Sequence, residues 1–541
     1  MDGDRTKMRL KRGSVLCHMI PSHERTGAGL RLGQASVEMA TKSFVLGISI
    51  ICQFLVIEAE PIHDDTSLLI SVNPQRQQLV DSLGRERFFH GTNVVYKHFP
   101  FHPTLEGYTN DSFSEVDMQI MQDLGLNVIR LGMMLPGYVP KRGQYNETYM
   151  EVIKTIVSKA AKYGIYTLLD MHQDVMSPKF CVEGFPDWAV NTGNADNFPF
   201  PMEDKYPLDP STGYPYQKDC DKHEWGDYYF SEAAAAAFQN LYNNTDGLLD
   251  AWADFWRKTA QGFKDENSVI GYEFINEPFS GDIYRDPTLM APGIADEKNL
   301  APAYEVLQKA IREVDSRHSL FFEGATWDFF AVGFKQVPGG EEYKNRSVLS
   351  YHYYEPPDFN KRFQFEIRKE DLQRLQCGGV LTEFWTAGSS NKAFEDMYEI
   401  MDLTDLHMQS WMGWLYKAYG CDKNHLGCLI SPRGDKNATV HEYWLHNTSR
   451  TFPQAVAGNT ISFKYDRNSH RFNLAYSVST DCKSTQSIVY INEKLHYPQG
   501  YMVEISPSQS VTWQQVGNKI IISHAKNLPP GTKVEFTISP K

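Results

Sequence analysis

Two patterns of hydrophobic residues divide the chain. Between residues 88 and 415, short apolar runs with high β-propensity alternate with stretches in which apolar residues recur at helical spacing. After about residue 450 the helical spacing disappears, and short runs with polar and apolar residues in alternation are separated by turn residues. The first pattern predicts strands connected by helices, and the second predicts a small β-sandwich.

The first region contains eight strand-like segments. They are residues 88–95, 127–132, 166–171, 269–275, 319–323, 347–353, 379–384 and 409–415. Helical patterns at 114–124, 149–163, 250–263 and 303–314 lie between several of them. Eight strands in alternation with helices predict a (β/α)8 TIM barrel, an α/β fold. A doubly wound open sheet is the alternative, although it does not need eight such units.

These patterns give the expected domain boundaries. We expect a signal-peptide region at 1–59, a barrel at 60–449 and a β-sandwich at 450–541. Within the barrel, residues 177–244 interrupt the alternation and are rich in Pro, Gly, Asp and aromatic residues. Because long irregular segments in a compact domain are commonly functional, we expect an ordered lid or cleft wall there.

One long apolar run, residues 44–57, lies near the amino end of the chain. It is short for a bilayer span, follows Lys42 and is followed by a plausible cleavage site at 57–59, which suits a secretory signal. Met39 is an alternative start that gives a signal of ordinary length. We therefore expect a secreted protein, or one of an endolysosomal or digestive lumen. A signal anchor that tethers the protein to a membrane is the alternative.

Glycosylation and disulfide bonds fit this secretory route. Asn-x-Ser/Thr sequons lie at Asn110, Asn146, Asn243, Asn345, Asn437 and Asn447. Six cysteines follow residue 59, and we expect the pairs Cys181–Cys220 and Cys421–Cys428. Neither a CxxC pair nor an HExxH motif is present, so no metal and no cofactor are expected. The formal net charge of −14 argues against a nucleic-acid partner, and we expect a monomer.

Polar and aromatic residues gather where the predicted strands end. In strand order they are Lys97, Arg130, His172, Asp174, Asn276, Glu277, His352, Tyr354, Glu383 and Trp414. Because the carboxyl ends of barrel strands meet at one face, these side chains are expected to converge there.

Two of them, Glu277 and Glu383, are glutamates that end the fourth and seventh strands. A glycoside hydrolase needs one protonated and one ionised carboxyl group, and a separation of about 5–5.5 Å gives a retaining mechanism. Arg130 and Tyr354 are expected to hold Glu383 ionised. Asn276 is expected to bind the sugar hydroxyl next to the cleaved bond, and Trp414 offers a stacking face.

The chain resembles glycoside hydrolase family 5. The resemblance is carried by Arg130 in Asn-Val-Ile-Arg-Leu, His172, Asn276-Glu277-Pro278, His352-Tyr353-Tyr354, Glu383 and Trp414. Residues 95–97, residues 170–174 and the trailing sandwich further resemble the endoglycoceramidases. The resemblance implies that Glu277 is the acid/base and Glu383 the nucleophile. It also implies that Lys97, His172, Asp174 and Trp414 hold the glucose next to the lipid.

The resemblance implies hydrolysis of the β-glycosidic bond between oligosaccharide and ceramide in glycosphingolipids, with transient contact to a membrane or micelle surface. Residues 133–136 and Phe180, Phe185 and Trp188 are the candidates for an apolar wall that faces the ceramide. One alternative is a related β-glucosidase, endoglucanase or steryl-glucosidase. The other is a catalytically silent glycolipid-binding protein, although neither glutamate is missing here.

Overall fold

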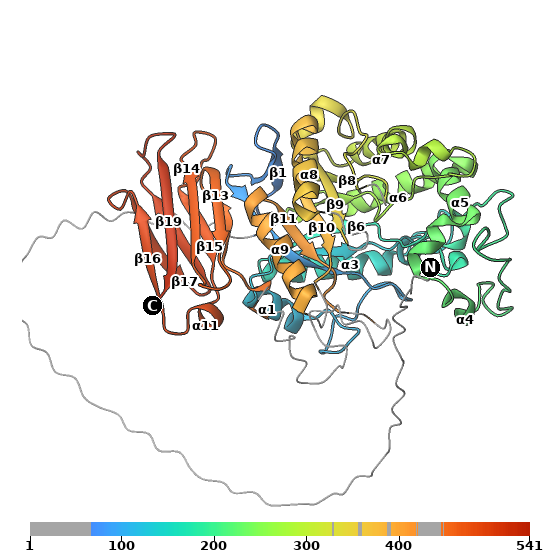
Figure 1. The fold of residues 1–541 in the computed structure, drawn as a ribbon, viewed down its shortest axis with the longest axis horizontal. Coiled ribbons are helices and arrows are strands. Elements are labelled where there is room, and N and C mark those ends of the chain that lie inside the picture. Colours follow the sequence, from blue (N-terminus) through green and yellow to red (C-terminus); the bar gives the residue numbers. More distant parts are fainter. Residues whose placement is uncertain are drawn as a thin grey trace, which may run out of the picture. The chain divides into compact units, whose positions relative to one another are not determined.

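A closed barrel of eight parallel strands forms the centre of the protein (Figure 1). The computed structural model describes residues 66–326, 329–354, 360–386, 391–417, 419, 445–446 and 448–541. The barrel strands are β4 (His90–Val94), β5 (Val128–Gly132), β6 (Tyr166–Asp170), β7 (Val269–Glu273), β8 (Ser319–Glu323), β9 (Ser347–Tyr353), β10 (Gly378–Phe384) and β11 (Ser410–Gly413). They pair in chain order, and β11 closes the barrel against β4. The predicted TIM barrel is confirmed.

Helices surround these strands. They are α1 (Glu115–Asp123), α2 (Leu135–Tyr138), α3 (Glu147–Lys162), α4 (Gln217–Cys220), α5 (Glu232–Tyr242), α6 (Leu248–Phe263), α7 (Ala301–Arg312), α8 (Lys361–Leu375) and α9 (Asn391–His407). Every residue of β5 to β8 is buried, as expected where helices cover one face of a parallel sheet and side chains fill the other. Local signals set the helix ends: Asn146 caps α3, and Gly164 follows it with φ +73°.

A hairpin closes the amino end of the barrel. Its strands are β1 (Ile70–Asn73) and β2 (Gln78–Asp81), which pair antiparallel. Ile70, Val72 and Leu79 are buried in one hydrophobic cluster with barrel residues such as Val128 and Val380. The opposite end of the barrel, where the strands finish, is therefore the end at which a site can open.

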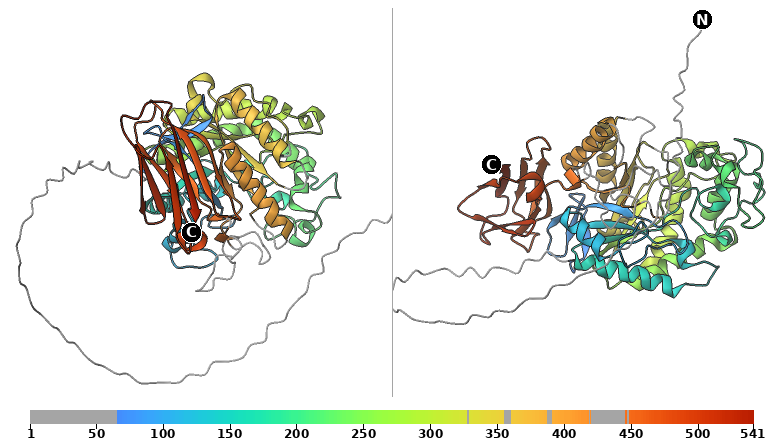
Figure 2. Two further views of the ribbon diagram at one scale, coloured as in Figure 1. Left: turned by 60° about the vertical axis from the view of Figure 1, so that its left-hand side comes forward. Right: turned by 90° about the horizontal axis from the view of Figure 1, so that it is seen from below.

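The C-terminal domain is a β-sandwich, as predicted. One sheet has the order β1-β2-β3-β12-β15-β18-β17, and the other has the order β13-β14-β19-β16. The strands not yet given are β3 (Glu86–Arg87), β12 (Phe452–Val456), β13 (Asn459–Tyr465), β14 (Phe472–Ser477), β15 (Gln486–Tyr490), β16 (Tyr501–Ser506), β17 (Val511–Val516), β18 (Lys519–His524) and β19 (Lys533–Pro540), and α11 spans Glu493–His496. Strands β1 to β3 lie within the 60–449 range expected for the barrel, yet they extend a sandwich sheet. Figure 2 shows the two sheets beside the barrel.

Buried contacts join the barrel and the sandwich. Phe88, just before β4, packs edge-on against Phe463 of β13 with ring centroids 4.8 Å apart. Arg450 is buried and forms ion pairs with Asp405 (2.5 Å) and Asp402 (2.9 Å) of α9. Apolar packing and paired charges thus connect the two domains.

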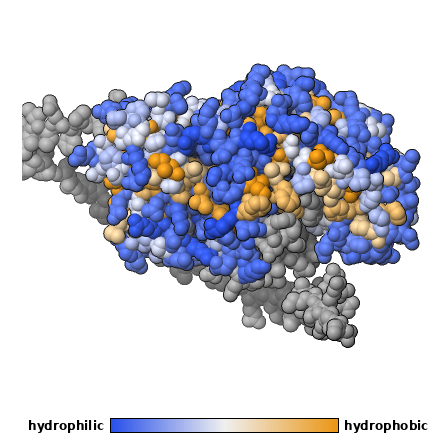
Figure 3. Space-filling model, turned by 45° about the horizontal axis from the view of Figure 1, so that its top comes forward, coloured by the Kyte–Doolittle hydropathy of each residue, from blue (hydrophilic) through white to orange (hydrophobic). Residues whose placement is uncertain are grey.

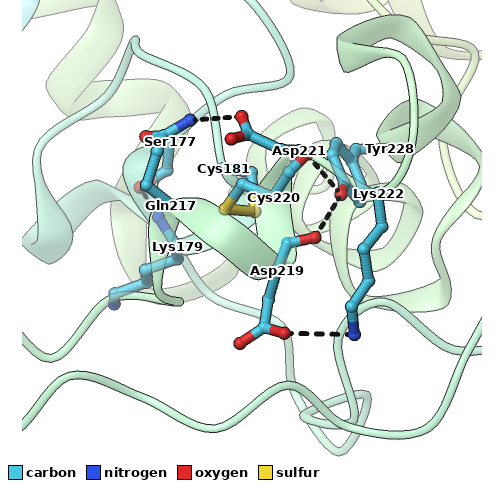
Figure 4. The surroundings of a disulfide bond; sticks show 9 residues. All are labelled: Ser177, Lys179, Cys181, Gln217, Asp219, Cys220, Asp221, Lys222 and Tyr228. Carbon is cyan, nitrogen blue, oxygen red and sulfur yellow. Dashed lines mark hydrogen bonds and ion pairs between the residues drawn. A yellow bond between two sulfur atoms is a disulfide. The ribbon is translucent and has the colours of Figure 1, made fainter.

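The segment at 177–244 is ordered, as expected. It contains α4, α5 and short 3-10 turns, and Cys181 forms the predicted disulfide with Cys220. Figure 4 shows this bridge, with the Tyr228 hydroxyl donating to the Cys220 carbonyl (2.9 Å). The bridge ties the loop that contains Glu183 to α4. Residues 224–227 come shortly after α4 in the chain.

Several sequence-based expectations fall outside the described residues. These are the signal-like run at 44–57, the pair Cys421–Cys428, and the sequons at Asn437 and Asn447. Across the part of the chain that the structure describes, no helix is long and apolar enough to cross a membrane.

Candidate active site

Arg130 is the centre of the polar cluster at the carboxyl end of the barrel. Its side chain is fully buried on β5 and pairs with Glu273 on β7 (2.5 Å) and with Glu383 on β10. It also donates to Asn276 (2.9 Å) and Asn93 (3.1 Å). A guanidinium group is always charged and has five donors in a fixed plane, so it can orient several acceptors at once.

Glu383 receives hydrogen bonds from two sides. Arg130 donates to Oε1, and the Tyr354 hydroxyl donates to Oε2 at 2.7 Å. Both interactions favour a carboxylate anion over a neutral acid. The structure therefore brings Glu383 together with the two residues that the sequence analysis grouped around it.

Glu277 lies across the cavity from Glu383. One carboxyl oxygen of each lies within 4.8 Å of the other, which favours the close pair of a retaining glycosidase over the wider pair of an inverting one. Glu277 has φ +43°, a left-handed conformation that costs a residue with a side chain about 1–2 kcal/mol. Such a conformation at a strand end lets the side chain turn into the cavity, and strained residues of this kind gather at functional sites.

The two glutamates differ in their surroundings. Burial raises the pKa of Glu277 to about 8, and the nearby Asp174 adds to this effect. The neutral form of a carboxyl with such a pKa persists at neutral pH, so Glu277 can donate a proton. His352 Nδ1 lies 2.8 Å from Glu277 Oε1, and burial lowers the pKa of His352 to about 4. His352 is therefore neutral and does not hold Glu277 ionised by charge.

A second polar group lies on the β4 and β6 side of the cavity. Lys97 forms ion pairs with Asp174 and with Glu183 (2.5 Å). Although burial alone opposes both charges, the mutual attraction holds the pKa of Lys97 above its ordinary value and that of Asp174 below it. Lys97 is thus not a surface lysine but part of the cavity wall.

His172 and Trp414 form a flat face beside this group. Their rings stack at 5.3 Å with an interplanar angle of 12°, and Lys97 Nζ lies 4.9 Å from the Trp414 ring. His172 Nδ1 lies 2.8 Å from Asp170 Oδ2, within hydrogen-bond distance, and burial lowers the pKa of His172 to about 3. The neutral ring and the indole together offer polarizable surface next to the charged group.

All of these residues surround one cavity of about 960 Å³. Its lining includes Lys97, Asp174, Glu277, His352, Tyr354, Glu383 and Trp414 from the predicted set. Arg130, His172 and Asn276 are buried directly behind the lining, where they orient those side chains. The sequence analysis therefore placed its residues in one site.

The predicted apolar wall was wrong. Met133, Met134, Leu135, Phe180 and Phe185 are almost fully buried in the core between the strands and helices, and none of them lines the cavity. Trp188 lies away from the cavity too and donates to the Val139 carbonyl (2.9 Å). Their hydrophobicity serves packing, which sequence alone does not distinguish from a binding surface.

The apolar lining comes from other segments. Phe329 and Val332 follow β8, Phe365 belongs to α8, and Trp385 follows β10. These residues lie on the side of the cavity opposite β4 and β6 in the barrel order. Large apolar side chains of the lining are thus concentrated on this side, although Glu323 and Arg368 also line it.

Sequence reasoning missed several acidic residues of the site, among them Glu323 and Glu183. Glu323 ends β8, lines the cavity and accepts the Glu277 backbone N–H at 3.0 Å. Its position at a strand end was a usable signal. Glu183 offered no such signal, because it lies in the long loop after β6 and reaches Lys97 only through the fold.

Among the residues that the structure describes, three groups of acidic and histidine side chains come close enough to hold a cation. The group of His172, Asp174 and Glu183 has ligand atoms within 4.8 Å of one another. The Lys97 ammonium group already pairs with both of its carboxylates. The other two groups contain Glu273 or Glu383, which pair with Arg130. In each group at least one carboxylate is therefore already paired with a protein cation.

Two domain families match the chain. Residues 90–420 match the cellulase family (glycosyl hydrolase family 5), and residues 450–538 match the glycoside hydrolase family 5 C-terminal domain. The first match covers the barrel with both glutamates, and the second covers the sandwich.

Named relatives share most of the length. The chain is 71% identical to an endoglycoceramidase of Cyanea nozakii, over 89% of this chain and 96% of the relative. It is 57% identical to an endoglycoceramidase of Hydra vulgaris, over 92% and 94% of the two chains. The solved structure of endo-glycoceramidase II from Rhodococcus sp. has the same fold, with a TM-score of 0.66, 20% identity, and coverage of 85% of this chain and 99% of that one. The chain belongs to glycosyl hydrolase family 5.

Proposed function

We propose that this protein is a retaining endo-glycosidase that hydrolyses the β-glycosidic bond between the oligosaccharide and the ceramide of glycosphingolipids. The proposal for the chemistry is carried by one observation: two glutamates within 4.8 Å of each other, of which one bonds to Arg130 and the other has a raised pKa. The proposal for the substrate is supported by the high identity to two endoglycoceramidases.

In the proposed mechanism, the Glu383 carboxylate attacks the anomeric carbon of the sugar next to ceramide. Glu277 donates its proton to the glycosidic oxygen, so that ceramide leaves as a neutral alcohol and a covalent glycosyl-enzyme forms. Glu277, now ionised, then removes a proton from water, which attacks the same carbon and frees Glu383. Two inversions at one carbon retain its configuration.

Arg130 and Tyr354 hold the Glu383 carboxylate in place for this attack, and His352 orients Glu277 through the 2.8 Å contact. Asn276, held by Arg130, is placed to bind the sugar hydroxyl next to the cleaved bond. Lys97 and Asp174 provide charged hydrogen-bonding groups for the sugar, while His172 and Trp414 provide a stacking face.

The concentration of large apolar side chains on one side of the cavity fits a molecule with a polar and an apolar end. In this proposal the glycan lies toward Lys97 and Asp174, and the ceramide lies toward Phe329, Phe365 and Trp385. An amphiphilic substrate loses least solvation free energy when each end meets surface of its own kind.

Contact with a membrane or micelle surface is part of the proposal. Segments that line the cavity also carry exposed aromatic side chains, namely Phe330 (44% exposed), Phe363 (52%) and Trp385 (43%). Figure 3 shows orange hydrophobic residues gathered across the middle of the face that it presents. Secretion and glycosylation likewise remain expectations from the sequence.

Product analysis tests the proposed function. Purified protein is incubated with lactosylceramide and with a ganglioside. The products are identified by mass spectrometry, and proton NMR during the reaction shows the anomeric configuration of the newly released sugar. We expect intact ceramide and intact oligosaccharide, with the new hemiacetal first appearing as the β-anomer. Release of single sugars from the outer end, or cleavage of a steryl glucoside or soluble glucan without any ceramide release, would contradict the proposal and support one of the family alternatives.

A further inference from the structure

Glu323 is a buried acid with no place yet in the proposed mechanism. It is the last residue of β8, it lies between β7 and β9 in the barrel, and it is 6% exposed. Its Oε2 accepts the backbone N–H of Glu277 at 3.0 Å, and its Oε1 lies 3.6 Å from His352 Nδ1. The side chain therefore contacts both the backbone of Glu277 and the histidine that touches the Glu277 carboxyl.

The backbone of Glu277 needs such support. With φ +43° the residue is in the left-handed region, which residues with a side chain adopt only when their surroundings hold them there. Pro278 follows and restricts the conformation further. The carbonyl of Glu277 accepts from Gln173 (3.0 Å) and from the Tyr229 hydroxyl (3.1 Å). Glu323 accepts the N–H of Glu277, which belongs to the peptide group on the other side of the same residue.

We propose that Glu323 is a positioning residue for Glu277: its carboxyl oxygen holds the Glu277 N–H, and with it the backbone turn that directs the Glu277 carboxyl toward the glycosidic oxygen. This inference rests on the proposed role of Glu277 as acid/base. Glu323 itself does not touch the reacting atoms in this scheme.

The groups around Glu323 indicate that hydrogen bonding, not charge, is its contribution. Glu277 and Glu273 of the β7 region, His352 of β9 and Arg130 of β5 are the charged or titratable groups nearest to it, and Tyr304 of α7 donates to its main-chain carbonyl (2.8 Å). Burial and the neighbouring glutamates hold the pKa of Glu323 well above its usual range. A neutral carboxyl and a glutamine amide offer the same acceptor oxygen.

Because glutamine keeps the acceptor oxygen, variants of Glu323 can separate the role of this oxygen from that of the acid proton. Glu323→Gln keeps the acceptor, whereas Glu323→Ala removes it and Glu323→Asp shortens the reach by one methylene. Tyr304→Phe is the matched control, because it removes a hydrogen bond to the main chain of the same residue and leaves the carboxyl group in place. Thermal unfolding of each variant shows whether it is folded, and Glu323→Asp provides the test if the alanine variant is not.

Each variant is assayed on lactosylceramide, whose leaving group needs a proton, and on 2,4-dinitrophenyl β-lactoside, whose leaving group does not. A misplaced acid lowers kcat/KM only for the first substrate, because kcat/KM reports formation of the glycosyl-enzyme and not its later hydrolysis. For Glu323→Ala we expect kcat/KM on lactosylceramide to fall roughly 100-fold, with kcat/KM on the aryl lactoside within about 3-fold of wild type. Glu323→Gln and Tyr304→Phe are expected to stay within about 3-fold on both.

Other outcomes overturn the inference. If Glu323→Ala slows both substrates equally, Glu323 supports the structure in general and does not position the acid. If it slows neither, the hydrogen bond is unimportant. If Glu323→Gln loses as much as Glu323→Ala, the acid proton of Glu323 matters and the acceptor does not. Failure of the proposed function is separate, because wild-type protein would then release no ceramide at all.

Discussion

At the scale of single residues, two glutamates in one cavity have different surroundings. Glu383 accepts from Arg130 and Tyr354, whereas Glu277 faces a neutral His352 and has a raised pKa. The two side chains are chemically the same, so only their neighbours can give them different roles. We therefore assign Glu277 as the proton donor and Glu383 as the anion. The difference can be tested by removing each carboxyl in turn.

Replacing either glutamate by glutamine should strongly reduce ceramide release, for a different reason in each case. Glu277→Gln loses the proton donor, so turnover of lactosylceramide should fall roughly 10²–10⁴-fold, with a smaller effect on formation of the glycosyl-enzyme from a dinitrophenyl lactoside. Azide should then rescue this variant and give a β-glycosyl azide. Glu383→Gln loses the nucleophile and should be inactive on both substrates. If azide affected the two variants equally, the assigned roles would be contradicted. If it gave a β-glycosyl azide with Glu383→Gln only, the roles would be reversed.

The raised pKa of Glu277 also predicts the pH dependence. The carboxyl must be protonated in the free enzyme, so kcat/KM on lactosylceramide should fall as pH rises through about 8. This basic limb should disappear in kcat/KM for the dinitrophenyl lactoside, because that leaving group needs no proton. The stability linkage has the same direction: a carboxyl with a raised pKa in the folded state favours folding most at low pH, and this contribution is lost between about pH 4.5 and 8. A basic limb that is identical for both substrates would point to another group.

At the scale of elements, the strand-end rule explains which site residues the sequence could predict. Arg130, Glu277 and Glu383 each stand on or just after a short apolar run, and a barrel brings such positions together whatever the loops do. Glu183 could not be predicted in this way, because its position depends on the course of an irregular loop. Helix α5 was also missed, since alanines at 233–237 give no amphipathic period.

The disulfide in that loop should matter for both stability and substrate binding. Cys181 and Cys220 are 39 residues apart in sequence, so the bridge restricts the unfolded chain and is expected to contribute about 2–4 kcal/mol. It also fixes the loop in which Glu183 follows Cys181 by two residues and pairs with Lys97. We expect Cys181→Ser/Cys220→Ser to unfold at lower denaturant concentration and to show a KM for lactosylceramide raised several-fold, with kcat changed less.

Chemical unfolding and steady-state kinetics measure these two effects, and Cys377→Ser is the control because Cys377 is a buried free thiol. A double variant with wild-type KM would show that the loop wall holds its shape without the bridge.

At the scale of the whole molecule, the barrel and the sandwich are joined more closely than the sequence pattern suggested. Strands β1 to β3 precede the barrel, yet β3 pairs with β12, which comes more than 360 residues later. Strands of two to four residues give almost no periodic signal, and their partner is fixed only when both domains have folded. The change in texture near residue 450 therefore revealed the second domain but not the amino-terminal strands that extend its sheet.

A comparison of a buried with an exposed ion pair between α9 and the sandwich tests how strongly the domains are coupled. Asp405 pairs with Arg450 where both side chains are buried, whereas Glu395 pairs with Arg467 near the surface. Asp405→Ala leaves the buried Arg450 with only the more exposed Asp402 as its carboxylate partner, so it should lower the free energy of unfolding by about 3 kcal/mol. Glu395→Ala, the matched control on the same helix, should cost less than about 1 kcal/mol. Denaturant unfolding followed by tryptophan fluorescence and by circular dichroism should show one shared transition that Asp405→Ala shifts. If the two probes separate in the wild type, or if both variants cost the same, the buried contact does not couple the domains.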